Sequence, residues 1–275
     1  MAIEVRRVQE PAEVLEVADS FLLSRPTEHN VVLTLLEARR RQPQPGRYWL
    51  ISDGSDVQGV GFQSPLSFVA TVTPMPVPAA RALADVMAGE DPPLPGLNGE
   101  APTAAALAGQ WTERTKLPAV PWQGQRLYQA RAIRAPRGVP GDVRLGRPAD
   151  RDQLVEWVRA FHQEATPEEP ANPAATVDSR LPAGDMWVWD DGEPRSMTTL
   201  APATAGVVRI QAVYTPPAHR GRGFAGAMVA SLSEQILGQG DLPALYADLG
   251  NPVSNSIYRR IGFECVAEIL RYRFG

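Results

Sequence analysis

The stretch that decides the fold is PPAHRGRGFAGAM, residues 216–228. Within it, Gly221, Gly223 and Gly226 have the G-x-G-x-x-G spacing of dinucleotide-binding folds. Small residues between a strand and a helix let the main chain approach a phosphate closely, and the helix N-terminus adds the positive end of a dipole. The stretch therefore predicts a phosphate-binding turn.

A dinucleotide does not suit the surrounding sequence. In that fold the first glycine follows its strand at once, whereas PPAHR separates Gly221 from a strand predicted to end at Thr215. Proline cannot donate a hydrogen bond to a sheet, so the strand has ended before the turn. The residues after Gly226, 227–275, are too few for the further strand and helix units that hold a second nucleotide. We expect a different ligand.

Periodicity predicts the elements around the turn. Trp187 and Trp189 alternate with Met186 and Val188, so one pair either lines an acceptor site or packs in the core. The predicted order is β-α-α-β-β-β-α-β-α-β. Its elements are a strand at 143–145, a helix capped by Asp150, a helix at 174–181, three strands within 186–215, a helix at 221–237, a strand at 244–250, a helix at 251–260 and a strand at 263–274.

Two motifs in this order resemble those of one family. Residues 220–225 read Arg-x-x-Gly-x-Ala, which resembles motif A of the GNAT superfamily of acyl-CoA-dependent N-acyltransferases. Residues 251–263, NPVSNSIYRRIGF, resemble the family's motif B, in which an asparagine is followed seven residues later by a tyrosine. Asn251 and Tyr258 hold those places, and their spacing of two helical turns puts both on one helix face.

The resemblance implies an N-acetyltransferase that uses acetyl-CoA as a cosubstrate and transfers the acyl group directly to a primary amine of a small molecule or peptide. It implies that Tyr258 protonates the departing thiolate, which a phenol with a pKa near 10 can do at neutral pH. The residues implied to bind the cofactor are Val213, Thr215, Arg220, Gly221, Arg222, Gly223, Phe224, Ala225 and Asn251.

The base that would deprotonate the amine is not identified. Many relatives have a glutamate on the third strand, where VVRIQAV offers Gln211. Three roles stay open for the acidic residues of this half: the base acting through water, attraction of a cationic acceptor, or solvated loop charges. These residues are Glu164, Glu168, Glu169 and Asp178. A non-catalytic acyl-CoA-binding sensor or protein-interaction module is the alternative function.

The first half repeats the predicted element order with little sequence likeness. PMPVPAA, residues 74–80, stands where the second half has HRGRGFA, so no glycine-rich turn remains. Proline and glycine interrupt the pattern over residues 134–150. We expect a degenerate GNAT-like domain at 1–140 and an acyl-CoA-binding catalytic GNAT domain at 141–275. Each is expected to be α/β (α+β), a mixed, mostly antiparallel sheet flanked by helices.

Composition excludes several other classes. The net charge of −4 gives no attraction to nucleic acid or an anionic membrane. Cys265 is the one cysteine, and the three histidines have no partners at a zinc-like spacing, so we expect no metal site. No apolar run is long enough for a membrane span and the N-terminus lacks the apolar core of a signal peptide, so we expect a cytoplasmic protein.

Overall fold

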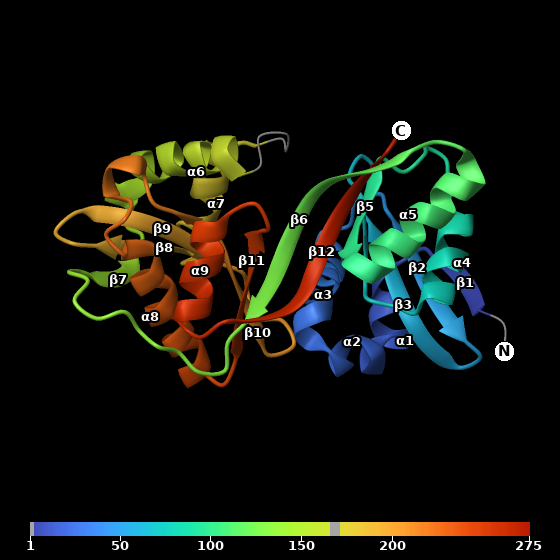
Figure 1. Cartoon of the computed structure of the whole chain (residues 1–275), viewed down its shortest axis with the longest axis horizontal. Helices are drawn as coiled ribbons and strands as arrows, with labels where there is room; N and C mark the ends of the chain where they lie inside the picture. The colour runs from blue at the N-terminus through green and yellow to red at the C-terminus, as the bar shows by residue number, and fades with distance from the viewer. Residues whose placement is uncertain (1–2, 166–170) are drawn as a thin grey trace. The chain divides into compact units, whose positions relative to one another are not determined.

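The computed structural model describes residues 3–165 and 171–275, which form two compact units (Figure 1). The first unit contains the chain up to Leu127 together with Ala247–Asn251 and Cys265–Gly275. The second contains Tyr128–Tyr246 and Pro252–Glu264. No helix in the described part of the chain is long and apolar enough to cross a membrane.

The sheet of the first unit has the strand order β1-β2-β3-β4-β5-β12. Its β4 and β5 run parallel, whereas β1 with β2, β2 with β3, β3 with β4 and β5 with β12 run antiparallel. Its elements are β1 (Ile3–Val8), α1 (Pro11–Val17), α2 (Asp19–Ser24), α3 (Pro26–Arg41), β2 (Arg47–Asp53), β3 (Asp56–Gln63), β4 (Ala70–Val72), α4 (Val77–Met87), β5 (Gly96–Glu100), α5 (Ala101–Thr115), most of β6 (Ala119–Gln129) and β12 (Glu264–Phe274).

The sheet of the second unit has the order β11-β10-β9-β8-β7, with β10 and β11 parallel and the other pairs antiparallel. Short 3₁₀ turns, η1 (Pro148–Asp150) and η2 (Pro217–His219), precede α6 and the glycine stretch. Its elements are β7 (Asp142–Leu145), α6 (Arg151–Ala165), α7 (Pro173–Arg180), β8 (Met186–Asp190), β9 (Pro194–Leu200), β10 (Val207–Tyr214), α8 (Phe224–Gly238), β11 (Leu242–Asp248) and α9 (Pro252–Arg260).

The predicted fold class is confirmed, because both units are mixed, mostly antiparallel sheets flanked by helices. Some element bounds were wrong. In the first unit, residues Pro11 to Ser24 form two helices, since the dihedral angles of Ala18 leave the helical region between them. The helix predicted from Gly221 begins at Phe224, because Gly221 and Gly223 both have positive φ.

The segments at the ends of the two sequence copies belong to units that their order in the chain does not predict. The last strand, β12, pairs antiparallel with β5 in the first unit, from Ile269↔Glu100 to Arg273↔Gly96. Residues 128–140 belong to the second unit, although they precede the expected boundary at residue 141. The expected boundary at residue 141 separates the two copies of the sequence, and the division between copies stays a prediction.

Two apolar cores cover the two faces of the second unit's sheet. Helices α6 and α7 pack on one face against Met186, Val188 and Met197, while α8 packs on the other (Figure 1). Trp189 and Trp187 face α8 and pack near Phe224 and Met228. Of the two interpretations of the tryptophans, core packing is therefore the correct one.

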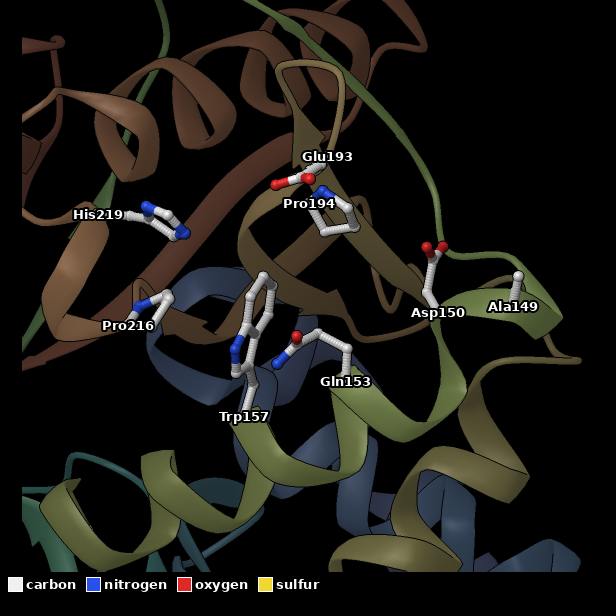
Figure 2. A pocket seen from close by; sticks show the side chains of 8 residues that line it. All are labelled: Ala149, Asp150, Gln153, Trp157, Glu193, Pro194, Pro216 and His219. Carbon is white, nitrogen blue, oxygen red and sulfur yellow. The ribbon is translucent and has the colours of Figure 1, made fainter.

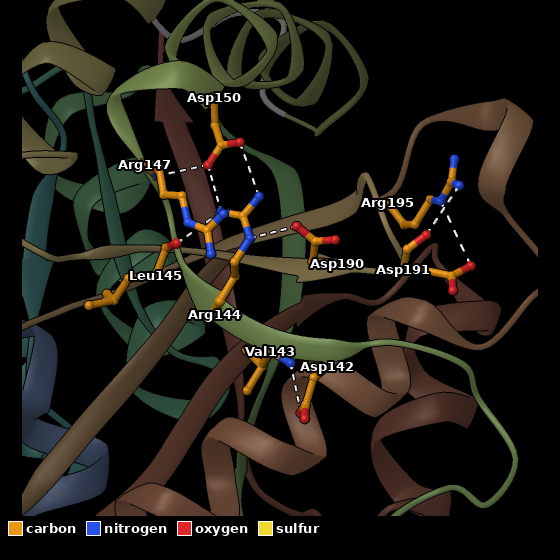
Figure 3. A network of polar contacts seen from close by, with 9 residues as sticks. All are labelled: Asp142, Val143, Arg144, Leu145, Arg147, Asp150, Asp190, Asp191 and Arg195. Atoms are coloured by element: carbon orange, nitrogen blue, oxygen red, sulfur yellow. Dashed lines mark hydrogen bonds and ion pairs between the residues drawn. The ribbon is translucent and has the colours of Figure 1, made fainter.

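A partly buried ion-pair network fixes the start of α6 (Figure 3). The Arg144 guanidinium donates to Asp150 at 2.7 Å and to Asp190 at 2.6 Å. Asp150 also accepts from the main-chain N–H of Arg147 at 2.7 Å. Burial alone would raise the pKa of Asp150, but these hydrogen bonds outweigh burial and lower its pKa. Asp150 is thus committed to holding η1 and β7 together.

Replacing Asp150 with asparagine should lower the free energy of unfolding of the second unit by about 2 kcal/mol, since charged hydrogen bonds are lost. Because the folded-state pKa of Asp150 is lowered, its stabilisation is present above its unfolded pKa near 4 and lost as pH falls through the folded value. Urea titrations at several pH values test this. Asp152→Asn, on an exposed side chain, should leave stability unchanged, and an Asp150→Asn variant as stable as the wild type would contradict the assignment.

Candidate functional site

A β-bulge interrupts β10 near its end. Ile210 and Gln211 pair with Leu200 and Thr199, but Tyr214 pairs with Met197, so β10 has one residue more than β9 over this span. Ala212 takes φ of 50°, a left-handed conformation that is strained for alanine. The side-chain hydroxyl of Thr198 donates to the Gln211 carbonyl at 2.7 Å and closes the bulge. Strained backbone of this kind is concentrated at functional sites.

The bulge lies where the central parallel strands stop pairing. The register of β10 and β11 runs from Val207↔Leu242 to Ile210↔Leu245, whereas β10 continues to Tyr214. Val213 packs on the α8 face and Tyr214 on the α6 face. The end of β10 therefore extends beyond its parallel partner, where an extended, amide-bearing ligand can pair with the main chain.

The glycine turn joins this strand end to α8. Gly221 and Gly223 have φ of 77° and 85°, and Gly223 is the N-cap residue of α8. Gly223, the N-cap residue, has no side chain, so no N-cap side chain accepts from the first N–H groups of α8. A Cβ atom on Gly223 would lie 3.1 Å from Cγ2 of Val139, whereas one on Gly221 would meet nothing within 4 Å. The turn thus presents main-chain donors at a positive dipole end, as anion binding requires.

The two arginines of the turn have different surroundings. Arg220 donates through Nε to the Thr215 carbonyl at 2.8 Å, and its terminal nitrogen lies 2.7 Å from the Glu164 carboxylate. The Arg222 guanidinium lies 4.7 Å from the centroid of the Phe224 ring. Arg220 therefore ties the strand end to α6, while Arg222 lies over the start of α8.

The carboxylates considered as bases are engaged elsewhere or not described. Glu164 is held by Arg220 and accepts from the Tyr214 hydroxyl at 3.5 Å. Asp178 pairs with Arg151 at 2.7 Å, and this hydrogen bond lowers the pKa of Asp178. Glu168 and Glu169 lie outside the described residues. Neither described carboxylate is an unpaired group.

The motif B residues lie at α9. Tyr258 is buried in the second unit between the rings of Tyr128 and Phe263, whose centroids are 6.2 Å and 6.1 Å away. Burial raises the pKa of Tyr258, and its hydroxyl has no hydrogen-bond partner among the described residues. Asn251 is exposed immediately before α9, and by its contacts it belongs to the first unit.

A pocket of about 550 Å³ flanks the link between β10 and the glycine turn (Figure 2). Trp157 and Gln153 reach it from α6, Pro216 and His219 from the link, and Glu193 from the β8–β9 turn. The Nδ1 atom of His219 is buried without a partner in the part of the chain that the structure describes. Sequence reasoning missed Trp157 and Gln153, because nothing separates them from the ordinary periodicity of an amphipathic helix.

The corresponding turn of the first unit, at residues 74–80, has few free main-chain donors. Met75 is 9% exposed and packs in the core. Its main-chain N–H donates to the Thr103 hydroxyl at 3.1 Å, and that hydroxyl donates to the Met75 carbonyl at 3.2 Å. Pro76 and Pro78 occupy the N-cap and second position of α4, where each removes an N–H donor. This helix N-terminus therefore offers an anion few donors.

Comparisons with known proteins agree with this geometry. Residues 196–272 match the family described as FR47-like protein. A GCN5-related N-acetyltransferase from Sphaerobacter thermophilus superposes with a TM-score of 0.65 at 17% identity, over 98% of this chain and 95% of that one. The chain has the GNAT fold, in tandem.

Two further structures align over nearly the full length of the chain. A GNAT-family acetyltransferase from Colwellia psychrerythraea gives a TM-score of 0.63 at 9% identity, covering 99% of this chain and 100% of that one. A tandem GNAT protein from the clavulanic acid biosynthesis pathway gives 0.54 at 14% identity, covering 98% of both chains. No curated protein matches by sequence. At these identities the likeness shows the GNAT fold alone, and the reaction is inferred from the site.

Proposed function

We propose that this tandem GNAT protein is an acyl-CoA-dependent N-acyltransferase that moves an acyl group, acetyl in the first instance, to a primary amine by direct transfer. One observation carries the proposal: a bulged strand end leads into a glycine turn at the uncapped N-terminus of α8. The strand end suits an amide-bearing arm and the turn suits a diphosphate. Coenzyme A contains both.

The residues of the turn fit the cofactor. Gly223 adopts a conformation that favours glycine and has no room for a larger side chain toward Val139. Bound acetyl-CoA would supply an activated thioester carbonyl. Main-chain groups of the turn would hold its diphosphate, Arg220 and Arg222 would add charge at the rim, and Asn251 would contact its arm. The proposed holding residues are Val213, Thr215, Gly221, Gly223, Phe224 and Ala225, together with these three side chains.

The chain's own groups would then do the chemical work. A main-chain N–H near Val213 would polarise the carbonyl oxygen, which is the kind of preorganised donor that stabilises developing negative charge. Tyr258 would give its proton to the leaving sulfur. A phenol is protonated at neutral pH, as an acid must be, and the thiolate that forms beside it would accept the proton. Gln211 cannot accept a proton, so the amine would lose its proton to water or to a carboxylate acting through water.

Glu164→Gln separates a binding role for Glu164 from a role as the base. Because Glu164 holds Arg220, and Arg220 holds Thr215, its loss should raise the KM for acetyl-CoA by no more than about fivefold, the effect of a surface ion pair. The pH profile of kcat should not change. A fall in kcat of about a hundredfold or more would instead make Glu164 the base.

The function itself is tested with the full chain and two measurements. Calorimetry with acetyl-CoA should show binding, and NAD, run as the control, should neither bind nor raise the melting temperature. Thiol release should then be followed against a panel of amines, amino acids and aminoglycosides. Binding without release for every amine would favour the alternative of an acyl-CoA sensor, and no binding at all would refute the proposal.

A further inference from the structure

Two arginines of the second unit lie on the sheet face covered by α6 and α7. Ile210 of β10 pairs with Leu200, and Leu200 packs against the core beneath α8. Residues that face each other across a strand pair share a face, and neighbours along a strand alternate. Arg209 and Gln211 therefore point to the opposite face, where α7 ends at Arg180.

Both guanidinium groups contain buried, unsatisfied nitrogen atoms. Nε of Arg209 and Nη1 of Arg180 are buried and have no hydrogen-bond partner among the described residues. Within residues 3–165 and 171–275, no carboxylate forms an ion pair with either arginine. Burial lowers the pKa of Arg209, and the positive charge of Arg180 lowers it further. A buried cation without a counter-ion is costly, and a second cation nearby adds to the cost.

The pair lies on the strand that carries the bulge. Arg209 precedes Val213 by four residues, so at the usual rise the two are separated by about 13 Å or less along β10. Gln211 lies between them on the face of Arg209. Tyr246 of β11 shares that face, because Ala244, two residues before it on the strand, is the parallel partner of Arg209. A single ligand with an amine at the bulge and an anionic group a few carbon atoms away would reach both the bulge and the two arginines.

We propose that Arg180 and Arg209 bind an oxyanion of the acceptor, so that the acceptor is an amine that also bears a carboxylate or a phosphate. The inference rests on the proposed acyltransferase function. Paired guanidinium forks are suited to planar or tetrahedral oxyanions, which they bind through two hydrogen bonds each. The bound anion supplies the counter-charge that the described residues lack. The arginines are therefore specificity residues, distinct from the groups that act on the thioester.

Matched amines test the proposal with the full-length protein. β-Alanine is compared with β-alaninamide, and ethanolamine phosphate with ethanolamine, by following thiol release from acetyl-CoA. The anionic member of at least one pair should have a KM lower by about tenfold or more, and the pair with the larger ratio identifies carboxylate or phosphate. Equal KM values within both pairs would overturn the proposal.

Variants assign the effect to the arginines. Arg209→Gln and Arg180→Gln should abolish the KM ratio, while Arg159→Gln, on an exposed arginine of α6 paired with Glu156, should keep it. Without ligand, Arg209→Gln should melt at the wild-type temperature or higher, because an unpaired buried charge is removed. A variant that melts several degrees lower and keeps the ratio would show that Arg209 is structural and would contradict the proposal.

A thermal-shift arm keeps this test apart from the test of the acyltransferase. If no amine releases thiol, the proposed function fails, and the same anionic compounds are assayed for a rise in melting temperature. A rise in the wild type that is lost in Arg209→Gln supports the oxyanion site by itself. The absence of any rise overturns it.

Discussion

Gly223→Val should weaken acetyl-CoA binding at least a hundredfold, a loss of about 2.7 kcal/mol. Gly223 has φ of 85°, and its added Cβ would lie 3.1 Å from Val139. A β-branched side chain strains this backbone and occupies the space through which the N–H groups of the turn reach a diphosphate. Calorimetry measures the loss, and thermal melting reports whether the fold persists.

Two further glycine variants control this result. Gly238, the last residue of the same helix, has open space around its Cβ position, so Gly238→Ala should bind acetyl-CoA normally and be as stable as the wild type or about 0.5–1 kcal/mol more stable. Gly221→Ala has room but an unfavourable φ, so it should weaken binding less than Gly223→Val. Wild-type affinity in a folded Gly223→Val protein would place the diphosphate elsewhere.

Tyr258→Phe should lower kcat by about a hundredfold or more, the usual contribution of a general acid. Its affinity for acetyl-CoA should change little, because the ring that packs against Tyr128 and Phe263 is retained. Steady-state thiol release and calorimetry measure the two quantities separately. Unchanged turnover would show that Tyr258 is only a buried aromatic residue.

Tyr128→Phe is the matched control for this change. The Tyr128 hydroxyl donates to Asn255 of α9 at 2.8 Å, and both residues are buried. Its loss should lower the free energy of unfolding by about 1 kcal/mol while leaving kcat near the wild-type value. If both tyrosine variants lost activity equally, the loss would come from a disturbed α9 rather than from a missing acid.

The sequence predicts well what is local. The glycine turn follows from residue types, because few residues other than glycine adopt the positive φ found at Gly221 and Gly223. The helix that carries Tyr258 and the alternation of Trp187 and Trp189 follow from periodicity. The bulge at Ala212 does not, since alanine takes the left-handed conformation there only because the Gln211 carbonyl is bound by Thr198.

Long-range features were not predictable. The pairing of β12 with β5 joins residues far apart in the chain, and no local pattern states which edge strand a closing strand will choose. Arg180 and Arg209 share one face of the sheet because α7 covers the face to which Arg209 points. The hydrogen bonds that hold the Met75 main chain come from Thr103, a residue of α5. Such contacts are set by tertiary packing.

A crystal structure of the full chain with coenzyme A tests the central claim most directly. We predict diphosphate oxygens within hydrogen-bond distance of the main-chain nitrogens of residues 221–225, with the amide-bearing arm beside Val213. Coenzyme A bound at another place, or a turn whose main-chain N–H groups are all satisfied by protein, would contradict the account.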